Sequence, residues 1–185
     1  MKRARARIHH RFLCSARLIF AAALLVLAPR ITQAQDWQTF RYPADGFSAA
    51  FPTMPHQDNR DIETQAGKVE LRSYTLEVDE VALFIGVCDY GTKAEGTAAD
   101  DMLEGAKNGA LQNSKAQLTR ESKIAIGGYK GLEFESESDG THYIARIYMV
   151  GTRMFQTLVV YPSASPYPDA TRFLDSFQLL THEGN

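Results

Sequence analysis

Short turn dipeptides that separate β-rich runs constrain the fold of this chain more than any other feature of its sequence. Asp45-Gly46 and Asp139-Gly140 each lie between runs rich in aromatic and β-branched residues. Such dipeptides join neighbouring antiparallel strands, because aspartate and glycine tolerate the backbone dihedrals that tight hairpin turns need. The sequence therefore predicts an antiparallel sheet assembled from hairpins.

Two hairpins are predicted in the first half of the chain. One occupies residues 37–52 around the Asp45-Gly46 turn, and proline residues follow its second strand. The other pairs residues 68–78 with residues 81–90, although the alternation of apolar and polar side chains in it is imperfect. The intervening residues, which include His56, are predicted to form a loop.

The second half of the chain contains four more strand-like runs. Turn signals separate them, so three of these strands are expected to form a meander. One run alternates apolar or small residues with glutamates, which predicts one buried and one solvated face. The runs are residues 123–126, 132–137, 143–150 and 154–161, and the alternating residues are Leu132, Phe134 and Ser136 against Glu133, Glu135 and Glu137.

Two helices are predicted between and after these strands. The first begins at Thr97 with a capping-box-like start, carries Asp100 and Asp101 in its first turn and extends to about Gln112. The second covers residues 169–180. Each has an apolar stripe, so the predicted fold class is α+β, an antiparallel sheet of hairpins and a meander covered by two helices on one or both faces. The stripes are Met102, Leu103, Ala106, Ala110 and Leu111, and Ala170, Phe173, Leu174 and Phe177.

The N-terminal segment has the pattern of an export signal. Residues 1–34 hold seven basic and no acidic side chains, an apolar run at 18–28 and a small residue, Ala34, at the expected cleavage position. The run of 11 apolar residues is shorter than the roughly 20 that span a bilayer. We therefore expect a signal peptide at 1–34, a single domain at 35–185, a periplasmic or secreted location, and no stable membrane insertion after cleavage. Retention of the signal as an anchor stays open.

The charge of the predicted mature chain excludes two classes of binding partner. Without residues 1–34 the chain has 13 basic and 22 acidic side chains, a formal charge of −9. Nucleic acids and anionic lipid surfaces attract basic proteins, so neither is an expected partner.

The residues that could carry chemistry do not form a recognisable constellation in the sequence. Cys88 lies in an apolar run and is predicted to be a small buried core residue, without a local histidine to activate it. His56, His142 and His182 are far apart and are expected to be independent and solvent-exposed. Residues 133–139 could form a weak cation site or a solvated edge, and the solvated edge is favoured. We assign no catalytic residue, no cofactor and no metal ligand from the sequence.

Aromatic and proline residues near the second helix form another candidate surface. Exposed tyrosines on rigid loops can anchor a partner, but they also close the ends of hydrophobic cores, and the packing role is favoured. The residues are Tyr161, Pro162, Pro166, Tyr167 and Pro168, with Trp37, Phe40 and Tyr42 as possible neighbours.

Three groups of residues resemble the exported bacterial relatives of the PsbP-like fold, which the nuclear Ran-release factor shares. They are Gly46-Phe47 with Phe51-Pro52 and Pro55, the run Gly127-Gly128-Tyr129-Lys130-Gly131, and the run Arg172-Phe173-Leu174-Asp175-Ser176-Phe177. The resemblance covers nearly all of residues 37–180 and implies a PsbP-like α/β/α sandwich. Members of the family that are named by function are binding and assembly proteins, so it implies a binding role and identifies no functional residue here.

Three functions are compatible with these observations. The favoured one is an exported, non-enzymatic binding or accessory module for an envelope protein partner or a small ligand. The alternatives are a small exported enzyme whose site forms only in three dimensions, for instance from Asp89 or Asp175 with Arg146 and a histidine, and an envelope structural protein held by an uncleaved signal. The sequence does not identify the partner, the ligand or the oligomeric state.

Overall fold

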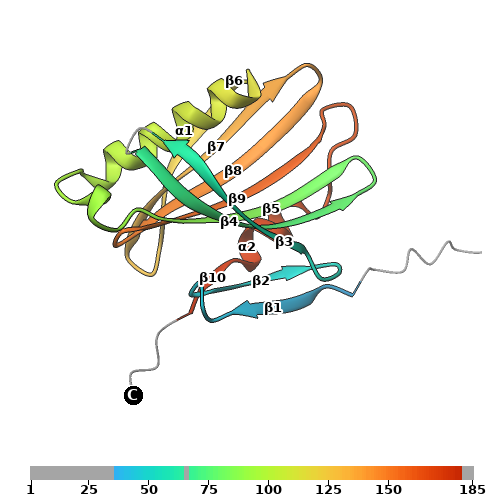
Figure 1. Cartoon of the computed structure of the whole chain (residues 1–185). Coiled ribbons are helices and arrows are strands. Elements are labelled where there is room, and N and C mark those ends of the chain that lie inside the picture. Colours follow the sequence, from blue (N-terminus) through green and yellow to red (C-terminus); the bar gives the residue numbers. More distant parts are fainter. Residues whose placement is uncertain (1–35, 65–66, 181–185) are drawn as a thin grey trace, which may run out of the picture. The chain divides into compact units, whose positions relative to one another are not determined.

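The computed structural model of the protein describes residues 36–64 and 67–180. In this part the chain forms two antiparallel sheets, two α-helices and one short 3₁₀ helix, η1 (Gly91–Ala94) (Figure 1). The predicted α+β class is confirmed. The predicted signal segment and His182 lie outside the described residues.

The larger sheet has seven strands in the order β3-β4-β5-β9-β8-β7-β6. Strands β3 to β5 follow one another as hairpins, and β6 to β9 form a meander that returns to pair β9 with β5. Every neighbouring pair is antiparallel, as the turn signals predicted. The strands are β3 (His56–Thr64), β4 (Gly67–Val78), β5 (Val81–Asp89), β6 (Gln117–Ile126), β7 (Tyr129–Ser138), β8 (Thr141–Val150) and β9 (Arg153–Pro162).

The other elements cover the two faces of this sheet. Helix α1 (Ala99–Ser114) lies on one face, mainly over β7 and β8 (Figure 1). The smaller sheet, β1 (Gln38–Tyr42), β2 (Phe47–Phe51) and β10 (Gln178–Leu179), lies on the other face together with α2 (Ala170–Ser176). The large sheet is therefore the middle of three layers.

Each face of the large sheet packs against its own hydrophobic core. Alternation along β5 divides the side chains, since Leu83, Ile85 and Val87 join the core under the small sheet and Phe84 and Cys88 join the core under α1. The small-sheet core is rich in aromatic rings, with Phe47 within 6.3 Å of Phe155 between ring centroids. Its other fully or nearly fully buried aromatic residues are Phe51, Tyr74, Tyr148, Tyr161, Phe173 and Phe177.

Helix α1 is also held by a buried cation. Lys107 is buried and its ammonium lies 2.8 Å from Glu104 of the same helix and 2.6 Å from Glu121 of β6. Burial alone would lower the pKa of Lys107, but the two glutamates outweigh it and raise the pKa. The ammonium therefore stays charged and ties the helix to the edge strand.

The predicted turns and strands are largely confirmed. Hairpins turn at Asp45-Gly46, at Asp79-Glu80 and at Asp139-Gly140, where φ is 47° and 77°. The meander has four strands rather than three, because the run at 123–126 pairs with β7, and this strand, β6, extends back to Gln117. The glycine pair before Tyr129 forms the tight β6–β7 turn.

Three predictions about element boundaries are wrong. His56 begins strand β3 instead of lying in a loop, because the edge position exposes nearly all of β3 and leaves it no apolar alternation to detect. Helix α1 begins at Ala99 with Ala98 as its N-cap, and Thr97 makes no side-chain capping bond. The second helix ends at Ser176, after which Gln178–Leu179 pairs with β2 as β10.

The buried hydroxyl of Thr157 gives a test of this packing. Thr157 is 0% exposed in the middle of β9, and its Oγ1 has no hydrogen-bond partner among the described residues. Thr157→Val replaces that hydroxyl by a methyl group of similar shape, so we expect the free energy of unfolding to stay equal or rise by up to about 1 kcal/mol. Urea unfolding measures the change. Thr157→Ser keeps the hydroxyl and loses the methyl group, and should lower stability by about 1 kcal/mol; a stabilising Ser variant or a Val variant destabilised by more than that would contradict this packing.

Candidate functional site

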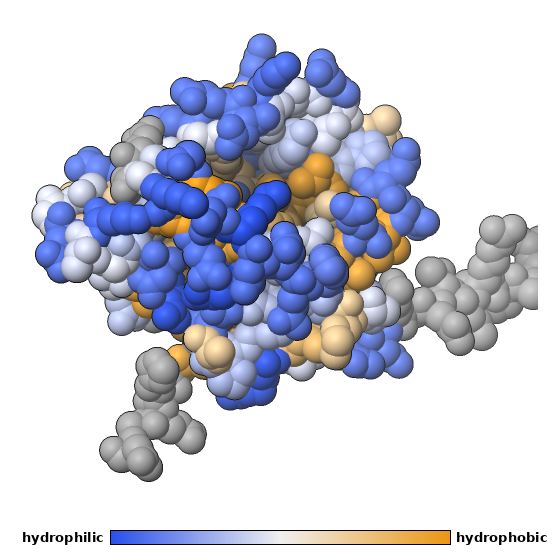
Figure 2. Space-filling model, in the orientation of Figure 1, coloured by the Kyte–Doolittle hydropathy of each residue, from blue (hydrophilic) through white to orange (hydrophobic). Residues whose placement is uncertain are grey.

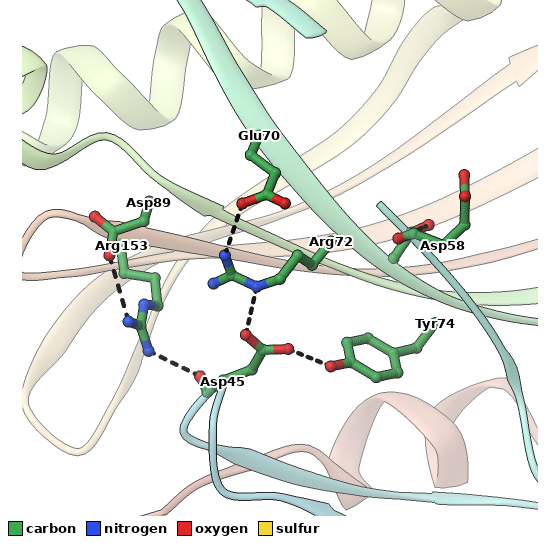
Figure 3. A network of polar contacts seen from close by, with 8 residues as sticks. Asp45, Asp58, Glu70, Arg72, Tyr74, Asp89 and Arg153 are labelled. Carbon is green, nitrogen blue, oxygen red and sulfur yellow. Dashed lines mark hydrogen bonds and ion pairs between the residues drawn. The ribbon is translucent and has the colours of Figure 1, made fainter. Parts of the chain in front are cut away.

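A buried carboxylate joins the two sheets. Asp45, in the turn between β1 and β2, is 4% exposed and accepts hydrogen bonds from Arg72 Nε at 2.5 Å and from the Tyr74 hydroxyl, both on β4 (Figure 3). Arg72 also contacts Glu70, 3.4 Å from Nη1 to the carboxylate. Burial, followed by the bond to Asp45, raises the pKa of Tyr74, so its hydroxyl remains a donor.

A second ion pair continues this network to the surface. Arg153, the first residue of β9, donates one hydrogen bond to the backbone carbonyl of Asp45 at 3.0 Å and another to the Asp89 carboxylate at 3.3 Å (Figure 3). Asp89, the last residue of β5, also accepts bonds from the Thr152 hydroxyl at 3.1 Å and the Gly91 amide at 3.0 Å. Three segments distant in the sequence therefore meet at one end of the large sheet.

The donors around Asp89 fix its protonation state. Partial burial alone would raise the pKa of this carboxyl, but the hydrogen bonds from Gly91, Thr152 and Arg153 outweigh burial and hold the pKa below its usual range. Asp89 is therefore ionised at neutral pH. A carboxylate whose pKa lies below its usual range is poorly matched to proton transfer at neutral pH.

An open cleft of about 890 Å³ lies beside this ion pair, and we call it the turn-end cleft. Its polar lining is Asp89, Thr152, Arg153 and Gln178, and the rest of its walls are apolar side chains from both sheets. Tyr129 stands at the edge and is 44% exposed. The apolar residues that line it are Ile126, Tyr129, Val150, Phe155, Phe177, Leu179 and Leu180, and the backbone is exposed to it at Gly46, Gly127 and Gly151.

The small sheet is what completes the turn-end cleft. The Leu180 amide donates to the Gly46 carbonyl at 2.8 Å, which holds the chain after β10 beside the β1–β2 turn. The turns after β6 and β8 supply the opposite wall. The cleft volume lies within the range of about 300–1,000 Å³ typical of ligand sites, and its lining combines apolar contact with one charged pair.

A different charged cluster lies on β7 and β8. Arg146 lies 2.6 Å from Glu133 and 2.7 Å from Asp175 of α2. Of the residues suggested for a convergent active site, Asp175 and Arg146 are thus brought together, whereas Asp89 pairs with Arg153 instead.

Histidine 142 corrects two of the sequence predictions. Its ring lies 3.0 Å from Glu137 and 3.5 Å from Glu135, and it packs against Tyr161 with a centroid distance of 5.0 Å. Its side chain is only 14% exposed, so the prediction of a solvent-exposed histidine is wrong for His142, whereas His56 is exposed. Glu133 pairs with Arg146 and Glu135 with Arg120, whereas Glu137 is exposed beside the His142 ring, and β7 lies between β8 and β6 instead of at an edge of the sheet.

Two other predictions about side chains are confirmed. Cys88 is buried in the core under α1, and burial raises the pKa of its thiol to about 11. Tyr161 is buried and Tyr167 is partly buried against the small-sheet core, so these tyrosines pack instead of forming an exposed surface. Trp37 likewise packs near Phe173, with the Arg172 guanidinium 4.9 Å from its ring centroid.

The turn-end cleft is not predictable from local sequence patterns. From the sequence, Asp45 is predicted only as a turn residue and Tyr74 only as an apolar position of a strand, while Arg72 and Arg153 are isolated charged residues within strands. One signal is present in β4, where Arg72 shares a strand face with the apolar Tyr74 and Leu76. Among residues 36–64 and 67–180, no group of three His, Cys, Asp or Glu side chains is arranged to hold a metal ion.

Comparison with known proteins supports the fold and leaves the activity open. No protein family profile matches the sequence, and no curated protein matches it. The solution structure of cyanobacterial PsbP (CyanoP) from Synechocystis sp. PCC 6803 aligns with a TM-score of 0.53 over 83% of this chain and 98% of that chain, at 13% identity. The described chain therefore has a PsbP-like α+β fold.

A second solved structure carries no argument about function. A protein of unknown function from Pseudomonas aeruginosa aligns over 69% of this chain and 84% of that chain at 10% identity. Its TM-score of 0.39 is too low to support an argument.

No helix in the described part of the chain is long and apolar enough to cross a membrane.

Removing the charge of Asp45 should weaken the whole domain. Asp45→Asn leaves Arg72 without its buried counter-ion, so we expect the free energy of unfolding to fall by about 2–3 kcal/mol in denaturant titrations. In a double-mutant cycle with Arg72→Met the two effects should be non-additive by about 2 kcal/mol. The exposed pair of Asp61 and Lys68, 2.8 Å apart, is the matched control, and Asp61→Asn should change stability by less than about 0.5 kcal/mol. Equal effects at Asp45 and Asp61 would contradict the structural role of the network.

The low pKa of Asp89 predicts a pH dependence of stability. Because the folded pKa lies below the unfolded value of about 3.9, the stabilisation by this carboxylate is complete above that value and is lost as pH falls through the folded pKa. Asp89→Asn should therefore be less stable than the parent at neutral pH, and the difference should shrink only below about pH 4. Urea unfolding at a series of pH values measures it. A difference that disappears already near neutral pH would show that the pKa of Asp89 is not lowered.

Proposed function

We propose that this protein is an exported, non-enzymatic binding module that receives an apolar segment of an envelope protein partner in the turn-end cleft. The observation that carries the proposal is the cleft itself, about 890 Å³ of open space with apolar walls beside the pair Asp89 and Arg153. A protruding apolar side chain can occupy such a cleft while its backbone reaches the exposed charges at the edge.

The charged pair supports binding over catalysis. Both groups already have partners, since Arg153 bonds to Asp89 and to the Asp45 carbonyl, and Asp89 accepts further bonds from Thr152 and Gly91. Groups fixed in this way are pre-organised for hydrogen bonding and need little reordering when a partner arrives. The resemblance to PsbP-like proteins, whose functionally named members bind or assemble other proteins, supports the same class of function.

Export is a part of this proposal that rests on the sequence. Residues 1–34 have the composition of a signal peptide, and cleavage after Ala34 would leave Gln35 at the N-terminus. The mature chain would carry the formal charge of −9 derived above, so an envelope partner with basic residues around its apolar segment would associate faster.

Position-specific cross-linking in the native cell tests the proposal. A photoreactive phenylalanine analogue replaces Tyr129 at the cleft edge, and the same analogue replaces Leu118 as the control. These side chains are equally exposed, at 44% and 43%, but Leu118 lies near the other end of the large sheet. We expect one defined protein adduct from position 129 and none from position 118. The intact mass of the isolated protein should correspond to a chain that starts at Gln35.

Binding of a small ligand and a role as an envelope structural component predict different results. Equal adducts at both positions, or none at 129 when the protein is folded and exported, would contradict a partner in the turn-end cleft. A small molecule that co-purifies with the protein and is lost in Val150→Arg, without any adduct at position 129, would show that the cleft binds a small ligand instead of a protein. A protein retained with its Met1 peptide in the membrane fraction would support the envelope structural component.

A further inference from the structure

A second recess lies on the opposite face of the large sheet. Helix α1 packs over β7 and β8, and beyond it the sheet face toward β3 and β4 remains open as a groove of about 470 Å³. Figure 2 shows hydrophobic surface in the hollow between α1 and the β3–β4 pair, with hydrophilic side chains around it. We call this recess the helix-side groove.

The floor of the helix-side groove is apolar and well defined. Phe84 of β5 lies with its ring over Gly86, where an added Cβ would stand only 2.9 Å from the ring atoms, so the absence of a side chain at Gly86 lets the ring lie flat. Leu71 closes one side of that position at 3.1 Å. The other apolar residues that line the groove are Ile62, Ala110, Phe134, Ala145 and Leu158.

The charges at the edge of the groove favour an anion. Arg60 of β3 lines it, and within residues 36–64 and 67–180 no carboxylate lies within ion-pairing distance of its guanidinium. Glu63 also lines the groove, but it lies near Lys68 and contributes to raising the pKa of that ammonium, as Asp61 does more strongly. The guanidinium of Arg60 is thus available to form an ion pair with an anionic ligand in the groove.

We propose that the helix-side groove binds a small monomeric amphiphile with an apolar chain and a single anionic head, of the class of medium-chain carboxylates. The chain lies on Phe84, Leu71 and Leu158, and the carboxylate head bonds to Arg60. Burial of an apolar chain supplies the free energy of binding, and the bidentate geometry of a guanidinium with a carboxylate fixes the orientation.

This site is independent of the proposed function. The turn-end cleft is lined by Phe155, Phe177 and Leu179 on the small-sheet side, whereas the helix-side groove is lined by α1 and by side chains such as Leu158 that point to the other face. Failure of either proposal leaves the other intact.

Titration with decanoate, followed by amide NMR, tests the proposal. The labelled protein is expressed with its own N-terminal segment, so that the host determines the mature start. We expect saturable shifts at Leu71, Phe84 and Leu158, and Arg60→Gln should weaken decanoate binding at least about threefold, the effect of one exposed charge pair. Arg41→Gln, at another exposed arginine on β1, is the matched control and should leave the affinity unchanged. Decanol has the same chain without the charge, and its affinity should not respond to Arg60→Gln.

Filling the groove gives a second and independent readout. Ala110→Leu adds bulk from α1 into the groove while keeping a good helix-forming residue, so it should abolish the decanoate shifts with little change in the thermal midpoint. Asn108→Leu makes a similar addition on the exposed side of α1 and should retain binding. The proposal is overturned if decanoate shifts residues of the turn-end cleft instead, if Ala110→Leu binds normally, or if Arg60→Gln weakens decanoate and decanol equally.

Discussion

The arrangement of the two sheets depends on the hydrogen bonds that the buried Asp45 carboxylate accepts. A charge removed from water is costly unless it is paired and hydrogen-bonded, and both donors to this carboxylate, Arg72 and Tyr74, belong to β4 of the other sheet. The small sheet therefore has one favourable position on the large one. That position brings the Asp45 carbonyl to 3.0 Å from Arg153, which also bonds to its cross-strand neighbour Asp89 in the large sheet, so residues of both sheets line the turn-end cleft.

The dimensions of the layers account for the helix-side groove. Seven strands about 4.8 Å apart make a sheet roughly 30 Å wide, whereas a helix with its side chains is about 10–12 Å across. One helix can cover only two or three strands, and α1 lies over β7 and β8, where Lys107 and Glu121 tie it to β6. Phe84 of β5 and Leu158 of β9 on that face are left only partly covered. On the other face α2 and the small sheet together give a more complete cover.

The local parts of this structure were predictable from the sequence, and the parts that depend on distant contacts were not. Asp139-Gly140 needs only its own backbone preference to form a turn, and the stripe of α1 needs only its own periodicity. Strand β3 was missed because its exposed edge position removes the apolar alternation. The turn-end cleft was missed because Asp45 and Arg72 are 27 residues apart in the sequence. They form an ion pair only when β4 lies beneath the β1–β2 turn. His142 was misjudged for the same reason, since Tyr161 and Glu135 cover it from neighbouring strands.

Native-state hydrogen exchange tests most directly whether the small sheet is an integral part of the fold that Asp45 fixes in place. The amides of Ala49 and Phe51 in β2 are compared with those of Ile85 and Val87 in β5, at the centre of the large sheet. Because both sets border one core, we expect them to exchange with the same opening free energy, equal to that of global unfolding. Exchange of the β2 amides through a separate opening of much lower free energy would show that the small sheet docks only loosely and would contradict this account.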